Sequence, residues 1–124
     1  MDKWIYLLIG GIIGTASRYG LSGFVSDKSG TVFPWGTLAV NVIGCFVIGF
    51  LDTIFEKKFF ISPNYRIFLM TGFCGAFTTF SALILETSKL LKENEYIYAF
   101  GNVAISFVIG FLAFKLGSVI AEMI

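Results

Sequence analysis

A short run of small and polar residues, 71–81, lies within an apolar segment long enough to cross a membrane. Its glycines, Gly72 and Gly75, weaken a continuous helix, because glycine in a helix interior costs about 1 kcal/mol relative to alanine. The pair Thr78 and Thr79 follows directly. In lipid, freed backbone groups persist only where they are buried in protein or line a cavity, and broken membrane helices place such groups where ions bind. We therefore predict that this run is the functional centre.

The composition is that of a membrane protein. Of 124 residues, 56% are hydrophobic and 14% are charged, against about 25% charged residues in soluble domains. The net charge of +1 provides no basic face and argues against a nucleic-acid partner. Histidine, the commonest general base and metal ligand, does not occur in the chain. The two cysteines lie in apolar segments and are interpreted as core residues.

The apolar segments predict four membrane crossings, because each crossing requires about 20 residues of helix. The first apolar run is glycine-rich and longer than the apolar core of a cleavable signal, so it is interpreted as a crossing. The expected fold is an all-α membrane protein with one domain, residues 1–124, and helices at about 4–24, 35–55, 67–91 and 96–119. The third helix is expected to be broken from Gly75 to Thr79.

The second predicted helix carries a polar face. Thr37, Asn41 and Gly44 are spaced i, i+4 and i+7. An asparagine in an apolar helix must be hydrogen-bonded, because an unpaired amide there costs about 2–7 kcal/mol. Asn41 can join two helices or direct an N–H group into an ion path. The spacing alone favours the joining role, and both interpretations stay open.

Two charged residues fall within the predicted crossings or near their ends. Arg18 either extends its head group to the membrane surface or points inward and attracts anions to a pore mouth, and the sequence favours neither. Glu86 is the one acid well inside an apolar segment. A carboxylate inside the membrane is a functional candidate by default, whereas a position at the helix end would make it interfacial.

Two further stripes flank the predicted break. Phe80 and Leu83 share a face of the third helix, a pattern that packing explains more often than function. On the fourth helix, Asn102, Ser106 and Gly110 recur at i, i+4 and i+8. Such a stripe suits close helix packing and also a hydroxyl-lined passage.

The distribution of basic residues gives the chain no clear orientation in a membrane. Under the predicted topology, one side holds Lys3, Lys57, Lys58, Arg66 and Lys115, and the other holds Arg18, Lys28, Lys89 and Lys92. Basic residues normally gather on the cytoplasmic side of a membrane protein. A division as even as this one therefore predicts insertion in both orientations. Four helices also enclose little interior. We therefore expect an antiparallel, dual-topology dimer with two-fold symmetry.

The chain resembles the CrcB/Fluc family of fluoride channels over essentially its whole length. Three motifs occur in the family's order, of which the third is the most specific: Gly10-Gly11-x-x-Gly14-x-x-x-Arg18-Tyr19, then Gly36-Thr37-Leu38-x-Val40-Asn41-x-x-Gly44, then Gly72-Phe73-Cys74-Gly75-x-x-Thr78-Thr79-Phe80-Ser81. The resemblance implies a dual-topology homodimer with two fluoride pores. It also implies a multi-pass protein of a bacterial or archaeal cell (inner) membrane.

The resemblance also implies a structural sodium ion (Na+) at the dimer interface. By position, its ligands would be the backbone carbonyls of Gly75 and Thr78 from both copies, a donor set that suits a hard cation. Asn41 matches the family's pore asparagine, and Phe80 the first of its two pore phenylalanines. Ser106 falls near the pore serine of the fourth helix.

One residue departs from the family pattern. The second pore phenylalanine normally follows the first by three residues, and that position is Leu83 here. A phenyl edge is electropositive and can face an anion, which a leucine cannot do. Some relatives act as pairs of different subunits. The chain is therefore either a homodimeric channel or one subunit of a heterodimeric channel.

The expected activity is passive, fluoride-selective conduction that lowers cytoplasmic fluoride. The proposed anion path uses donors from Asn41, Thr37, Ser81 and Ser106 together with the Phe80 edge. The opposing class is a small proton-coupled exporter of dual topology, which requires an acid in its first helix, where this chain has only Asp2 near the start. A purely structural subunit is a third possibility. An enzyme is not expected, because no nucleophile and base can be paired.

Overall fold

Residues 2–58 and 61–124 are described by a computed structural model, in which every regular element is a helix. The elements, in chain order, are α1 (Asp2–Ser29), α2 (Trp35–Lys57), α3 (Pro63–Arg66), the π-helix η1 (Ile67–Cys74), α4 (Gly75–Phe77), α5 (Phe80–Lys92) and α6 (Tyr96–Glu122). The all-helical prediction is confirmed for this part of the chain.

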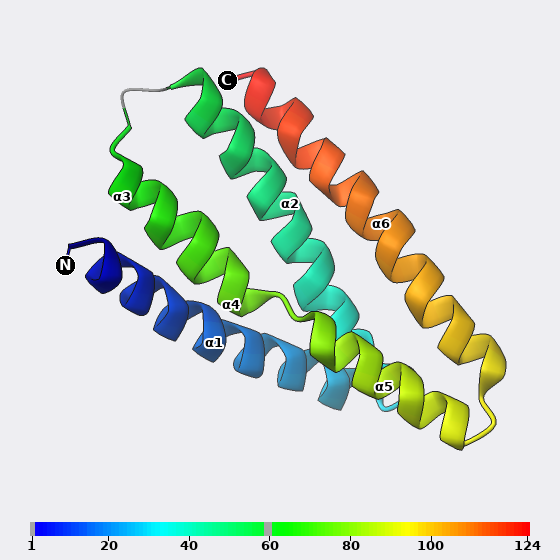
Figure 1. Ribbon diagram of the computed structural model, residues 1–124. Coiled ribbons are helices and arrows are strands. Elements are labelled where there is room, and N and C mark those ends of the chain that lie inside the picture. Colours follow the sequence, from blue (N-terminus) through cyan, green and yellow to red (C-terminus); the bar gives the residue numbers. More distant parts are fainter. Residues whose placement is uncertain (1, 59–60) are drawn as a thin grey trace.

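The helices form an elongated bundle in which α1 and the run from α3 to α5 point one way, while α2 and α6 point the other way (Figure 1). α1 packs against η1, α4 and α2, and α2 packs along α6. The run from α3 to α5 bends between α4 and α5. The bend therefore lies in the middle of the bundle, between α1 and α6 (Figure 1).

Three segments are long and apolar enough to cross a membrane, among the residues that the structure describes. They are Trp35–Lys57, Pro63–Lys92 and Tyr96–Glu122. α1 lies outside this set, although its 28 residues correspond to roughly 42 Å of helix at 1.5 Å per residue. The last three predicted crossings are thus supported, and the first stays a prediction.

The first helix extends five residues beyond its predicted end at residue 24. It ends at Ser29 because Gly30 adopts a φ of 60°, a left-handed conformation that is common just after a helix. The Gly30 N–H donates to the Ser26 carbonyl over 3.3 Å. The prediction placed this turn too early, since it gave more weight to polar residues than to the glycine.

The predicted break is wrong in its first half. Gly75, Ala76 and Phe77 remain helical, and only Thr78 and Thr79 are extended, with φ and ψ of −93° and 158° and of −151° and 120°. Glycine permits a departure from helical geometry and does not impose one. The π-helix η1, which precedes the break, has no signature in the sequence. Such helices occur often at functional sites.

Glycines set the distance between α1 and η1. A Cβ placed on Gly10 or Gly14 would collide with a backbone carbonyl of η1, at Phe68 and Phe73 respectively. A Cβ on Gly72 would lie 2.9 Å from the Leu7 carbonyl of α1. The i, i+4 spacing of Gly10 and Gly14 thus allows a close approach of α1 to η1.

Gly14→Val should weaken this contact strongly. Its side chain would meet backbone, which cannot rotate away, and overpacking of this kind costs about 1–3 kcal/mol or more. Gly20→Val is the matched control on α1, because a Cβ there meets nothing within 4 Å. We expect a lower thermal unfolding midpoint in detergent for Gly14→Val than for Gly20→Val. Equal midpoints would contradict the close approach.

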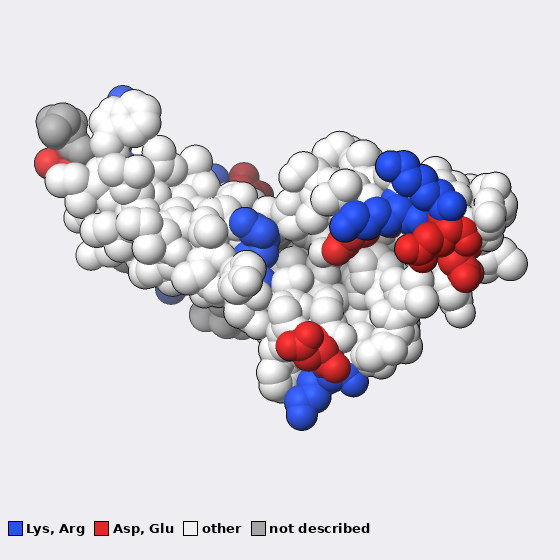
Figure 2. All heavy atoms as spheres, turned by 90° about the horizontal axis from the view of Figure 1, so that it is seen from below, with Lys and Arg blue, Asp and Glu red and all other residues white. Residues whose placement is uncertain are grey.

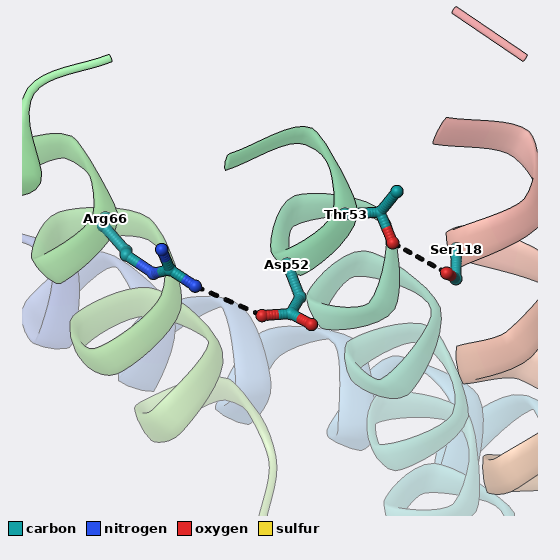
Figure 3. Close-up of polar contacts among 4 residues, drawn as sticks. All are labelled: Asp52, Thr53, Arg66 and Ser118. Carbon is teal, nitrogen blue, oxygen red and sulfur yellow. Dashed lines mark hydrogen bonds and ion pairs between the residues drawn. The ribbon is translucent and has the colours of Figure 1, made fainter. Parts of the chain in front are cut away.

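Polar contacts join α2 to its neighbours near its C-terminal end. Arg66 of α3 pairs with Asp52 of α2 over 3.2 Å, and the Thr53 and Ser118 hydroxyls lie 2.7 Å apart between α2 and α6 (Figure 3). The Lys57 ammonium donates to the Ala121 and Glu122 carbonyls over 3.3 and 3.0 Å. These contacts tie α3 and the end of α6 to α2.

Charged side chains gather in separate clusters on the face shown in Figure 2, and most of the surface between them is uncharged. Large apolar side chains are exposed along α1, α5 and α6, among them Ile12, Leu85 and Phe111. A surface of this kind suits lipid or another membrane helix rather than water.

Candidate functional site

The bend between α4 and α5 is capped by its own threonines. The Thr78 hydroxyl and the Thr78 N–H both donate to the Cys74 carbonyl, over 3.0 and 3.1 Å. The Thr79 hydroxyl accepts from the Ala82 N–H over 3.2 Å and thereby caps the start of α5. The threonine pair thus ends one helix and begins the next.

Asn41 of α2 holds the bend from the side. Its amide Nδ2 donates to the Thr79 carbonyl over 3.0 Å, and its Oδ1 accepts from the Thr79 N–H over 2.8 Å. Both backbone groups of Thr79 are therefore satisfied by one side chain. The helix-joining role that the spacing favoured is confirmed, and the second N–H of this amide has no partner among the described residues.

This arrangement leaves the Gly75 and Thr78 carbonyls without their helical hydrogen bonds. In a continuous helix, the Thr79 N–H would donate to Gly75 and the Ala82 N–H to Thr78. Here Asn41 and the Thr79 hydroxyl accept from these two donors instead. Among the described residues, nothing donates to the Gly75 or Thr78 carbonyl. Gly75 is also exposed.

A groove of about 660 Å³ runs past the bend, between α2, α5 and α6. It brings together most of the predicted site, namely Asn41, Gly75, Thr78, Phe80, Leu83 and Ser106. The rest of its wall is apolar, with Ile48 and Cys45 of α2 and several phenylalanines of α6. A largely apolar groove with a few convergent polar groups is typical of a binding site.

Phe80 and Leu83 differ sharply in this groove. Phe80 is 66% exposed, so its ring is available to an ion or to a second protein surface, whereas Leu83 is 5% exposed. The Ser106 hydroxyl is buried and has no hydrogen-bond partner in the described structure. A buried hydroxyl without a partner carries a desolvation cost, which a ligand in the groove would relieve.

Sequence reasoning missed three aromatic residues of this wall. Phe107, Phe111 and Phe114 of α6 line the same groove as Ser106. Ser106 and Phe107 are adjacent in the chain, and adjacent residues of a helix point about 100° apart. Both line the groove because it is wide enough to contact two sides of α6. The width of the groove cannot be predicted from the spacing of residues along one helix.

The other predicted site residues lie elsewhere. The buried Thr37 hydroxyl donates to Glu86 Oε2 over 2.9 Å, and Glu86 Oε1 is buried without a partner among the described residues. The Ser81 hydroxyl is exposed and lies 3.3 Å from that of Thr79. Arg18 Nε donates to the Ala76 carbonyl over 3.0 Å. Thr37, Ser81, Glu86 and Arg18 are therefore not part of the groove wall.

A second hollow, of about 850 Å³, lies on the other side of the bend, over α1 and η1. Its wall includes Leu8, Gly11 and Tyr19 of α1 with Thr71 of η1. Gly75 borders both hollows. Its unpaired carbonyl thus belongs to the segment that separates the groove from an exposed apolar face of α1.

A profile of one protein family, described as "CrcB-like protein, Camphor Resistance (CrcB)", matches residues 5–118. The chain belongs to the CrcB family. The match includes α2, the bend and most of α6, so every residue of the groove lies within it.

Curated CrcB relatives support this membership over their full lengths. The "Fluoride-specific ion channel FluC" of Desulforapulum autotrophicum is 44% identical over 98% of this chain and 98% of its own. The protein of the same name from Methylocella silvestris is 42% identical, over 98% and 94%. That of Sulfurihydrogenibium sp. is 39% identical over both whole chains. Because these relatives are named as channels, the chain is not an enzyme, as predicted.

Proposed function

We propose that this chain forms a fluoride-selective channel through which fluoride leaves the cytoplasm passively. The observation that carries the proposal is the groove at the bend, where the Asn41 amide, the Ser106 hydroxyl and the Phe80 ring converge. Relatives about 40% identical over the whole chain carry the name of a fluoride-specific channel. Selective conduction requires binding that is strong enough for entry and weak enough for release.

The donors of this groove suit a small, strongly hydrated anion. One Asn41 N–H is free, and the Ser106 hydroxyl lacks a partner in the described structure. The 13-residue α5 begins at Phe80 and directs the positive end of its dipole toward the bend. The Phe80 edge adds a weak positive potential. Ser81 would extend the donors beyond the groove, whereas the single hydroxyl proton of Thr37 is donated to Glu86.

A second copy in the opposite orientation would complete the channel. One monomer exposes Phe80 and the apolar face of α1, so neither hollow is closed by this chain alone. The near-even division of basic residues between the two ends of the bundle is compatible with insertion both ways. In this arrangement α1 would be the fourth crossing, packed on η1 through its glycines.

The residues present fit a structural sodium ion at the two-fold axis. The Gly75 and Thr78 carbonyls have no hydrogen-bond donor among the described residues, and Gly75 has no side chain to obstruct its exposed surface. Two copies would supply four carbonyl oxygens, ligands that a hard cation prefers. The ion would hold the two bends together.

Leu83 distinguishes this groove from a pore with two phenylalanines. Its side chain is buried against the groove wall while Phe80 is exposed, so a single phenylalanine of this pair is available to the anion. We propose that one exposed ring suffices and that the active form is a homodimer in the bacterial inner membrane. Pairing with a different subunit is the alternative that a direct assay decides.

Purified chain in liposomes should release fluoride rapidly and chloride slowly. The measurement is efflux of each anion, followed with an ion-selective electrode after a potassium ionophore is added. Liposomes without protein provide the control. Release of both anions at equal rates would refute selectivity. No release of either would refute the homodimer, and Leu83→Phe would then show whether the missing ring is the cause.

A further inference from the structure

The bend is held from two sides, and only one of the two contacts belongs to the proposed pore. Asn41 holds Thr79 from α2. On the α1 side, Arg18 Nε donates to the Ala76 carbonyl over 3.0 Å. In a continuous helix that carbonyl would accept from the Phe80 N–H, which the extended backbone at Thr78 and Thr79 moves away.

We propose that Arg18 is a positioning residue whose Nε–H donor, and not its positive charge, sets the geometry of the bend. Arg18 hydrogen-bonds the Ala76 carbonyl, which directly follows Gly75 and is also released by the bend. The carbonyls of Gly75 and Thr78 then stay available for a ligand at the surface. This inference rests on the proposed channel and its sodium site, and it concerns how the chain presents them.

The packing of α1 brings Arg18 to this carbonyl. Gly14 lies one turn earlier, and a Cβ placed on it would be 3.1 Å from the Ala76 Cβ. Side chains on a helix lean toward its N-terminus, so the Arg18 side chain extends back over this contact. The close approach of α1 to η1 and α4 therefore determines which backbone oxygen the guanidinium group reaches.

Within residues 2–58 and 61–124, no carboxylate forms an ion pair with Arg18. The ion pair found in the described residues joins Arg66 to Asp52 and does not include Arg18. The contact of Arg18 with protein is thus a charged donor on a neutral carbonyl, which is stronger than a bond between neutral groups. Attraction of anions would not require a hydrogen bond from Arg18 Nε to a backbone carbonyl, so this bond indicates a structural role.

Two uncharged substitutions separate the donor from the charge. In Arg18→Gln, the side-chain nitrogen follows Cδ, as Nε does in arginine, so a donor remains at that place without the charge. Arg18→Met has a similar length and flexibility and places a methyl group there. Both variants lose the positive charge of Arg18, but only Arg18→Gln keeps a hydrogen-bond donor at the position of Nε.

The test compares both variants with the unaltered chain in two assays. One is the sodium-dependent rise of the thermal unfolding midpoint of the protein in detergent, and the other is fluoride efflux from liposomes. We expect Arg18→Gln to keep the sodium-dependent rise and most of the flux. Arg18→Met should lose the rise and about tenfold or more of the flux, because the Ala76 carbonyl is left unpaired.

Equal behaviour of the two variants, whether both active or both inactive, would overturn the proposal. If Arg18→Met yields no folded protein, Arg18→Gln alone decides: loss of its flux and sodium response would mean that the charge is required. Absence of fluoride efflux from the unaltered chain would instead refute the proposed channel. Efflux without any sodium-dependent rise in the unaltered chain would refute the sodium site and this inference with it.

Discussion

Asn41→Ala should reduce fluoride efflux by about 100-fold or more, since it removes two hydrogen bonds to Thr79. Both backbone groups of Thr79 would then be unpaired in a part-buried bend, at a cost of up to about 1–3 kcal/mol each. The substitution also removes the free N–H that would face the anion. One substitution thus removes both the support of the bend and a hydrogen-bond donor to the anion. The measurement is initial efflux from liposomes at matched protein density.

Asn41→Asp divides these two contributions. An aspartate at this position can still accept from the Thr79 N–H, but its ionised carboxylate has no N–H for the Thr79 carbonyl or for an anion. We expect efflux as low as in Asn41→Ala, with a smaller loss of thermal stability. Asn64→Ala, a change outside the groove, is the control and should conduct normally. Full conduction by Asn41→Ala would remove this residue from the pore.

Phe80→Ile should be the second severe change, with a loss of at least about tenfold in flux. The ring is 66% exposed at the groove, so its removal creates no cavity in the folded core and should leave the unfolding midpoint nearly unchanged. The change removes the electropositive ring edge, and contacts of aromatic rings contribute about 0.5–1.5 kcal/mol. Leu83, three residues further along α5, supplies no second ring at this place.

Phe100→Ile provides the matched comparison for Phe80→Ile. Phe100 is 78% exposed on α6 and does not line the groove, so the same chemical change there should leave efflux intact. A loss of flux in both variants would indicate a general dependence on surface aromatics. Retained flux in Phe80→Ile would show that the anion path runs elsewhere, and Phe107 and Phe111 would become the rings to test.

The sequence by itself determined the class of protein and the main segments. Low charge content and long apolar runs leave only helices as spanning elements, because in lipid every backbone group must be paired within the chain. The close approach of α1 to η1 can be understood from Gly10 and Gly14, since two small residues at i and i+4 let another helix come near. The interruption of the third predicted helix within 71–81 was likewise predicted from helix propensity.

Only the tertiary structure decided how the bend is built and which side chains serve it. Whether glycine or threonine leaves the helix depends on what satisfies the released backbone groups, and here the partner is Asn41, 38 positions away in the chain. The same holds for the bond from Arg18 to Ala76, across 58 positions. Local pattern identifies residues able to donate or accept, whereas the pairing depends on helix packing that brings distant turns within about 3 Å.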